Sequence, residues 1–309
     1  MTNHIAMSFL ALFVTLATKQ SAGRMRVWRA LRALGSATLR DGVYLLPDAP
    51  EHAQAFEQIA ADVRGVDGTA GIYRLDGRDE DQQKSLIALF DRGEDYAALL
   101  KSIHAANPAD SKAVRLLHRE FSALSAIDFF PGEARRQAEE ALAALEAAAT
   151  GEPLSVSGKT RRLASADFSG RTWATRKHLW VDRMASAWLI QRYIDPDARF
   201  VWLDDPKHCP KKALGFDFDG AAFTHVGGLV TFEVLAASFG LESDPAIARI
   251  AAIVHFLDVG GVPVAEAAGI EAVLAGARAS AANDDALLID ASRLFDNLYK
   301  NYQQENPND

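Results

Sequence analysis

The sequence predicts an α+β protein of two domains, and three observations lead to this class. The chain has 309 residues, about twice the usual length of a single domain. Hydrophobic residues make up 49% and charged residues 24%, which is typical of a globular chain and excludes a disordered or collagen-like one. Apolar runs of strand length alternate with longer stretches of helical periodicity in both halves. We therefore expect a mixed fold with a hydrophobic core in each half.

The first half predicts an N-terminal domain over residues 1–150. Its expected elements, in order, are a strand over 8–16, a helix over 22–34 ended by Gly35, a second strand (or split hairpin) over 37–46 that is interrupted by Arg40-Asp41-Gly42, a helix over 51–63 and a strand over 71–75. This order is that of a ferredoxin-like unit, and a winged helix is the structural alternative. Helical patterns over 81–103, 113–124 and 132–149 then predict a helical appendage.

The second half predicts a C-terminal domain over residues 173–309, after a linker over 151–172 that is rich in Gly, Pro, Ser and Thr. Its expected strands and turns are short and come early, over 178–181, 200–203, 215–220 and 223–226. Its expected helices cover 184–194, 231–239, 246–257, 264–275 and 285–302. These elements predict an α/β domain rich in helices.

Charge is unevenly distributed along the chain. The net charge is −8, but residues 1–47 carry a net +5 and residues 159–192 a net +6. We therefore expect two anion-facing surfaces on an otherwise acidic body. A single cysteine, Cys209, excludes an intramolecular disulfide, and the apolar run over 6–18 is too short to span a bilayer. A cytoplasmic location without a membrane partner is expected.

The helix over 22–34 carries an arginine face. At 100° per residue, Val27, Leu31 and Leu34 form an apolar stripe, and several arginines fall on the opposite side. Guanidinium groups pair well with phosphate oxygens, so this face predicts DNA binding, and an ordinary solvated helix face is the alternative. The candidate DNA contacts are Lys19, Arg24, Arg26, Arg29, Arg32 and Arg40.

A second basic cluster precedes the helix that is expected after Asp182. Backbone N–H groups at a helix N-terminus, together with nearby cations, favour an anion. We therefore predict an oxyanion pocket, with Arg176, Lys177, Arg183 and His225 as its residues. The alternatives are that Asp182 caps the helix that follows it and that the arginines lie at a domain or dimer interface.

Metal-ligating residue types are scattered through the second half, at Asp217, Asp219, His225, Glu233, His255 and Asp258. His255 and Asp258 are three apart on an expected helix and so share a face. We predict a divalent metal site formed by His225, Glu233, His255, Asp258 and Asp182, and Zn, Mn and Fe are all compatible with imidazole and carboxylate ligands. The sequence contains neither HExxH nor CxxC, so a core histidine with ordinary surface acids is the alternative.

Three segments together resemble the bacterial ChrB family of chromate-resistance proteins. They are KQSAGRMRVWRALRALGSATLRDGVYLLP (19–47), KHLWVDRMASAWLIQRYIDP (177–196) and FDFDGAAFTHVGGLVTFE (216–233). The resemblance implies a cytoplasmic regulator of a chromate efflux operon that senses chromate or a similar oxyanion and binds operator DNA. The N-terminal half is also distantly similar to the phenylacetate-repressor type of regulator. By analogy with repressors of palindromic operators, we expect a homodimer.

A metal-dependent enzyme, built on the same His, Asp and Glu residues, is the rival function. The basic N-terminal face would then recruit a substrate or a partner. A plain interaction protein is the third hypothesis. The resemblance favours the regulator, and it implies neither an efflux pump nor a chromate reductase, because the sequence has no membrane span, no flavin fingerprint and no redox cysteine pair. Cys209 has no second cysteine to resolve it, so we do not expect it to be the sensor.

Overall fold

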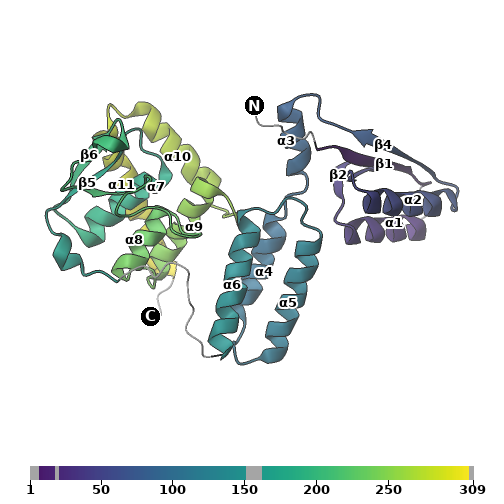
Figure 1. The fold of residues 1–309 in the computed structure, drawn as a ribbon, viewed down its shortest axis with the longest axis horizontal. Helices are drawn as coiled ribbons and strands as arrows, with labels where there is room; N and C mark the ends of the chain where they lie inside the picture. Colours follow the sequence, from purple (N-terminus) through teal and green to yellow (C-terminus); the bar gives the residue numbers. More distant parts are fainter. Residues whose placement is uncertain (1–6, 18–20, 151–161, 306–309) are drawn as a thin grey trace. The chain divides into compact units, whose positions relative to one another are not determined.

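The computed structural model describes residues 7–17, 21–150 and 162–305. The chain divides into two compact units, Met1–Leu142 and Ala143–Asp309, and the division falls within helix α6 (Glu133–Thr150) (Figure 1). Both units combine helices with a small sheet, so the predicted α+β class is confirmed. Of the predicted linker over 151–172, the structure describes only 162–172.

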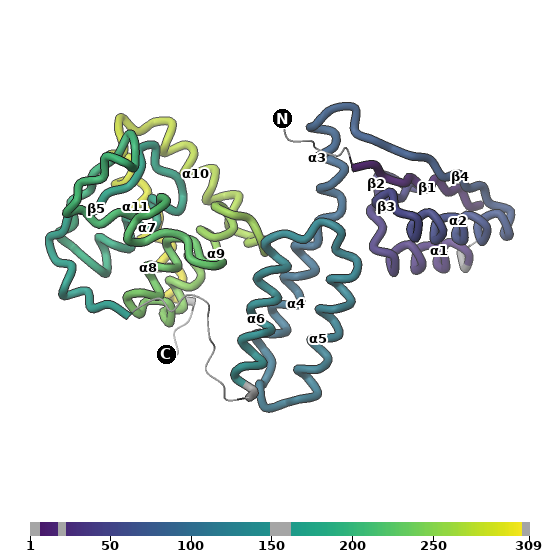
Figure 2. Tube along the Cα trace, viewed as in Figure 1, coloured from purple at the N-terminus to yellow at the C-terminus, as the bar shows by residue number. Residues whose placement is uncertain are grey.

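The N-terminal unit contains a four-stranded antiparallel sheet in the order β2-β3-β1-β4. Its elements in chain order are β1 (Phe9–Thr15), α1 (Ser21–Ala33), β2 (Ala37–Arg40), β3 (Val43–Pro47), α2 (Pro50–Arg64) and β4 (Thr69–Leu75). Two β-α-β units that interleave in this way form the ferredoxin-like arrangement. The ferredoxin-like prediction is therefore confirmed, and the winged helix is excluded. In Figures 1 and 2, α1 and α2 lie together on one side of the sheet.

One face of this sheet and the two helices share a core. Leu12 of β1, Leu31 of α1 and Phe56 of α2 are all buried in it. Gly35 ends α1, as predicted, with a φ of +69° that suits glycine. A Cβ at this position would lie 2.5 Å from the Cβ of Ile127, so the close approach of the chain also requires glycine.

Helices α3 (Glu80–Ala88), α4 (Gly93–Ala105) and α5 (Ser111–Ala126) follow the sheet. The single helix predicted over 81–103 is wrong, because the chain breaks between α3 and α4. At this break Phe90 is buried and stacks on Phe9 of β1, with ring centroids 5.5 Å apart. A buried aromatic residue in a turn satisfies the same apolar periodicity as one inside a helix, which is why the pattern did not reveal the break.

Among the described residues, the C-terminal unit has a three-stranded parallel sheet in the order β6-β5-β7, five complete α-helices and three shorter helical segments, Ser165–Phe168, Ile190–Ile194 and Pro206–His208. The strands are β5 (Thr172–Arg176), β6 (Arg199–Leu203) and β7 (Leu214–Gly215), and the helices are α7 (Val181–Leu189), α8 (Thr231–Phe239), α9 (Pro245–Val259), α10 (Ala267–Ser280) and α11 (Asp284–Glu305). No helix of the described residues is long and apolar enough to cross a membrane.

The strand predicted over 178–181 is wrong. The real strand, β5, ends at Arg176, and the apolar residues Leu179 and Val181 are buried in the turn and at the start of α7. Helix α7 packs against α8, α9 and α11, and Trp188 on α7 stacks on Phe232 of α8 at 6.4 Å. Val181 and Trp188, near the two ends of α7, are both buried, so the hydrophobic core fixes the whole helix, whose first turn follows β5.

Candidate metal centre

The candidate site lies at the carboxyl ends of the parallel strands β5 and β7. After β5 the chain enters α7, whose first turn carries Asp182 and Arg183, and Asp217 follows β7 closely. In sheets of this kind, ligands bind in the crevice outside the carboxyl ends of the strands. The parallel pairing of β5 with β7 thus brings together side chains that are far apart in the sequence.

Three side chains of types that can ligate a metal meet at this edge. Asp182, Asp217 and His225 each offer one ligand atom, and these atoms lie within 4.8 Å of one another. His225 Nε2 is 3.3 Å from Asp182 Oδ2 and 3.6 Å from Asp217 Oδ1. Asp258, near the end of α9, approaches the same nitrogen at 3.5 Å. One imidazole nitrogen carries at most one proton, so it cannot donate to all three carboxylates.

The spacing of these atoms suits a bound metal ion. Zn–N and Zn–O bonds of about 2.1 Å at tetrahedral angles place neighbouring ligand atoms roughly 3.4 Å apart. The nitrogen-to-oxygen separations of 3.3 and 3.6 Å within the triad of Asp182, Asp217 and His225 are close to this value. Imidazole and carboxylate also bind Mn²⁺ and Fe²⁺. The triad can therefore hold a divalent cation and leave coordination positions for other ligands.

Asp182 is held in place by the N-terminus of α8. Its two carboxylate oxygens accept the N–H groups of Thr231 at 3.0 Å and Phe232 at 2.8 Å, and its side chain is only 2% exposed. The alternative in which Asp182 caps its own helix is wrong, since the N-cap of α7 is Trp180. A carboxylate that is already fixed by hydrogen bonds is a well-oriented metal ligand.

Two arginines bind the outer oxygen of Asp217. Arg183 Nε lies 3.0 Å and Arg176 Nη2 3.5 Å from Asp217 Oδ2. Arg183 Nη1 also donates to the backbone carbonyls of Arg176, Lys177 and His178, which fixes the turn after β5. The predicted oxyanion residue Lys177 instead pairs with Asp204 at 2.9 Å. The structure thus gathers Arg176, Arg183 and His225 around Asp217, with Lys177 facing another carboxylate.

Burial and crowding perturb the acids and the imidazole of the site. Burial raises the pKa of Asp258 from 3.8 to about 6, and Asp182 and Asp217 contribute to this shift. Burial, followed by the charge of Asp182, also raises the pKa of Asp217. The hydrogen bond to Asp182 raises the pKa of His225. Carboxylates that repel one another in this way are relieved by a cation.

Asp258→Asn is expected to stabilise the metal-free protein by up to about 3 kcal/mol at pH 7. The pKa of Asp258 is higher in the folded state, about 6, than its usual value of 3.8, so folding favours the protonated acid. The ionised form therefore costs stability increasingly between about pH 4 and 6, and by a constant amount above. Urea denaturation should find the gain at pH 7 and none below about pH 4. The exposed Asp219→Asn is the control, and equal stabilities of Asp258→Asn and wild type at pH 7 would contradict the prediction.

Glu233 and His255, which were also predicted as ligands, form a pair of their own. His255 Nδ1 lies 2.8 Å from Glu233 Oε2, and the same oxygen accepts the N–H of Val230 at the start of α8. Neither residue belongs to the group of converging ligand atoms found among the described residues. Their role in the structure is to cap α8 and to connect it to α9.

Asp217 is the ligand that the predicted metal set lacked. It was noted as one of several acids, but nothing in its local pattern links it to Asp182. One signal was the short apolar segment that precedes it, because a residue just after a parallel strand is well placed for binding. Its φ of +54° is rare for a residue other than glycine, and such backbone conformations cluster at functional sites.

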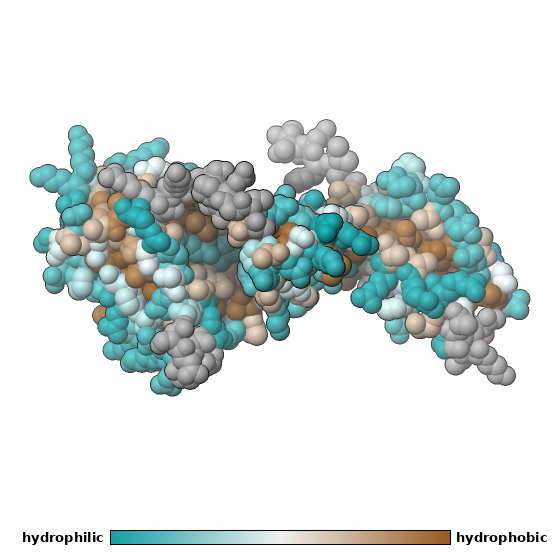
Figure 3. All heavy atoms as spheres, turned by 90° about the horizontal axis from the view of Figure 1, so that it is seen from below, coloured by the Kyte–Doolittle hydropathy of each residue, from teal (hydrophilic) through white to brown (hydrophobic). Residues whose placement is uncertain are grey.

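The predicted DNA-contacting residues in the N-terminal unit lie at the surface, except that Lys19 is outside the described residues. The exposed ones are Arg24, Arg26, Arg29, Arg32 and Arg40. Met25 and Trp28 are exposed on the same helix, by 49% and 45%, and the guanidinium of Arg32 lies 5.4 Å from the centre of the Trp28 ring. Figure 3 shows such mixing of hydrophilic and hydrophobic residues over this unit. Trp28 was not among the residues predicted to contact DNA.

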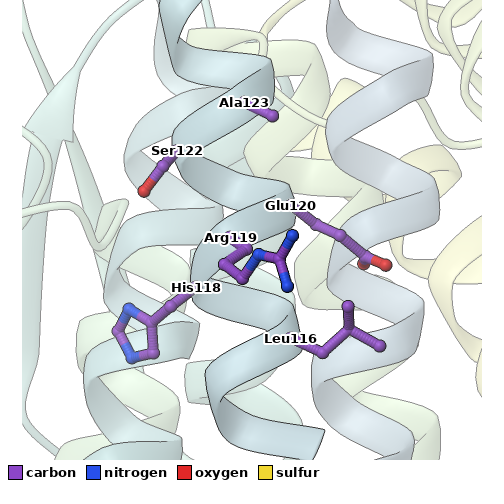
Figure 4. Close-up of a pocket in the computed structure, with 6 residues that line it drawn as sticks. All are labelled: Leu116, His118, Arg119, Glu120, Ser122 and Ala123. Atoms are coloured by element: carbon purple, nitrogen blue, oxygen red, sulfur yellow. The ribbon is translucent and has the colours of Figure 1, made fainter.

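A hollow on the N-terminal unit does not qualify as a site. Its described lining comes from α5 alone and consists of Leu116, His118, Arg119, Glu120, Ser122 and Ala123. In Figure 4, His118 and Ser122 point to one side of the helix, and Leu116 and Glu120 to the other. Side chains that diverge from one helix do not converge on a common ligand.

Comparisons with known proteins cover both units. Residues 24–107 match the family described as Protein ChrB, N-terminal, and residues 173–302 match ChrB, C-terminal domain. A protein of Cupriavidus metallidurans named Protein ChrB is 46% identical over 308 residues, which cover 96% of this chain and 95% of that protein. No solved structure matches the chain. The chain therefore belongs to the ChrB family and is a chromate-resistance-related protein.

Proposed function

We propose that this chain is a cytoplasmic, chromate-responsive transcriptional regulator whose N-terminal unit binds operator DNA. The observation that carries the proposal is the arginine face of α1. Between Arg24 and Arg40 the sequence contains no acidic residue, and the arginines of this stretch are exposed. The opposite side of α1 packs on the sheet through Val27 and Leu31, which leaves the arginine face available to a partner.

Phosphate is the partner chemistry that this face favours. Arginine pairs with phosphate oxygens through two parallel N–H groups, and such contacts position a protein on a duplex without reading its sequence. Trp28 adds an exposed aromatic ring beside Arg32. A repressor of a palindromic operator acts as a two-fold dimer, so the proposed regulator is a homodimer.

The C-terminal unit is the proposed sensing unit, and it holds a divalent metal through Asp182, Asp217 and His225. The spacing of the three ligand atoms and the crowding of carboxylates support this role. Zn²⁺, Mn²⁺ and Fe²⁺ are the candidates, because a mixed imidazole and carboxylate set suits all three. Chromate or a similar oxyanion is the proposed signal.

Arg29→Ala and Arg32→Ala are each expected to weaken DNA binding to a similar extent for all duplex sequences. Each loses about one phosphate contact, so each should lower the slope of log affinity against log salt by about one. Fluorescence anisotropy, with a duplex from upstream of the gene and a shuffled duplex, measures both effects. The exposed Arg78→Ala of the same unit is the control. A slope that stays unchanged in both α1 variants would exclude this face as the DNA contact.

A metal-dependent enzyme is the second candidate function, and one observation favours it. The converging group supplies three protein ligands among the described residues, and catalytic metal sites typically combine three protein ligands with an open position. Metal content without measurable affinity for DNA would favour the enzyme over the regulator.

A further inference from the structure

We propose that the metal centre binds a tetrahedral oxyanion directly, and that it does so only when the metal is present. This inference rests on the proposed function, in which Asp182, Asp217 and His225 hold a divalent cation. It adds the ligand class of that site and the residue that receives the anion, Arg176.

The formal charge of the cluster favours an anion only when a divalent cation is bound. Three carboxylates, those of Asp182, Asp217 and Asp258, lie within 3.6 Å of His225 Nε2. The two arginines on Asp217 add two positive charges, so the cluster carries a net charge of −1 with a neutral imidazole and of 0 with a protonated one. A divalent cation bound to the neutral imidazole changes the net charge to +1. A dianion is therefore not attracted by the net charge of the metal-free cluster and is attracted by that of the loaded one.

An anion can reach the metal site from solvent on one side of the cluster. The side chain of Asp182 is 2% exposed and that of His225 is 39% exposed, so the cluster is closed on the side of Asp182 and open to solvent on the side of the imidazole. Three protein ligands leave at least one position of a tetrahedral or octahedral ion for another ligand. An oxyanion oxygen can occupy that position from the solvent side.

Arg183 and Arg176 differ in how many of their N–H donors are already used within the protein. Asp217 bridges the two groups, because its Oδ1 faces His225 and its Oδ2 binds both guanidinium groups. Arg183 is committed through Nε to Asp217 and through Nη1 to three backbone carbonyls. Arg176 is 48% exposed and approaches Asp217 with Nη2 alone at 3.5 Å. Its remaining N–H donors are suited to the oxygens of an anion that also contacts the metal.

Calorimetry on the full-length protein tests the inference. After treatment with a chelator, chromate is titrated into the metal-free protein and into protein loaded with one equivalent of Zn²⁺. We expect chromate to bind at least about tenfold more tightly to the loaded protein. Arg176→Gln should lower the chromate affinity of the loaded protein by about tenfold and leave the Zn²⁺ affinity unchanged. Arg171→Gln, an exposed arginine just before β5, is the matched control and should change neither affinity.

Chromate is also an oxidant, so sulfate is titrated in parallel as a tetrahedral dianion that cannot oxidise the protein. Binding of sulfate to the loaded protein supports the site. Heat that appears with chromate alone and disappears in Cys209→Ser overturns it, because the signal then comes from the thiol. Equal chromate affinities with and without Zn²⁺ also overturn the inference, while the proposed metal site stands. Failure of Zn²⁺ itself to bind removes the metal from the proposed function as well, so the two failures are distinguishable.

Discussion

His225→Ala is expected to lower the affinity of this ChrB-family protein for a divalent metal by at least about a hundredfold. Loss of a residue that only orients a metal ligand already costs 10- to 100-fold, and His225 is itself a proposed ligand. Without the imidazole, the remaining carboxylates of Asp182 and Asp217 no longer form a group of three. The His225 side chain is 39% exposed, so its removal should leave the fold intact.

Metal analysis after dialysis and competition with a chromophoric chelator measure this effect for Zn²⁺, Mn²⁺ and Fe²⁺. The control is His208→Ala, because His208 is an exposed histidine in the loop between β6 and β7. We expect wild type and this control to bind about one metal ion per chain. Retention of one tightly bound ion by His225→Ala would rule out the triad as the metal centre.

Asp195→Ala is expected to destabilise the protein by about 3–5 kcal/mol, because each buried donor that loses its acceptor costs about 1–3 kcal/mol, and this is the largest change in stability that we predict. The carboxylate of Asp195 is fully buried and accepts three hydrogen bonds, from the N–H groups of Gly170 at 2.8 Å and Arg171 at 2.9 Å and from Trp173 Nε1 at 3.0 Å. Alanine would leave all three donors without their acceptor. The link between β5 and the end of the short helical segment Ile190–Ile194, which continues from α7, would then be lost.

Urea denaturation followed by circular dichroism measures the loss. Asp195→Asn should fall between wild type and Asp195→Ala, because the amide keeps one acceptor oxygen but places an NH₂ group against a donor. Asp197→Ala is the control, since Asp197 is exposed two residues away. A loss of less than about 1 kcal/mol in Asp195→Ala would show that these hydrogen bonds are exchanged for water at little cost.

Local patterns predicted most elements of the N-terminal unit. The helix expected over 22–34 is α1, Ser21–Ala33, and Gly35 ends it as expected. Of the two expectations for residues 37–46, an interrupted strand or a split hairpin, the structure has the hairpin, β2–β3. These features depend on helical periodicity, on backbone torsion angles and on turn residues, all of which act within a few residues of the chain. For this reason the ferredoxin-like order of elements was predictable from the sequence.

The wrong predictions of secondary structure lie where buried residues outside a strand or helix produce an apolar run. Residues 178–181 were predicted as a strand, yet they form a turn and the first residue of α7, with Leu179 and Val181 buried. The break at Phe90 was missed for a similar reason. Periodicity reports which side chains are buried, and a buried turn carries the same signal as a strand or a helix.

The sequence by itself determined the local elements, the arginine face of α1 and the residue types from which a metal site could be built. Only the tertiary structure decided which of these residues meet. The parallel pairing of β5 with β7 places Asp217 beside Asp182, and the packing of α7 against α8 turns the carboxylate of Asp182 toward the N-terminus of α8. The packing of α8 and α9 instead pairs Glu233 with His255. These contacts join residues that are distant in the chain, and their free energy depends on strand order and helix packing, which no local propensity encodes.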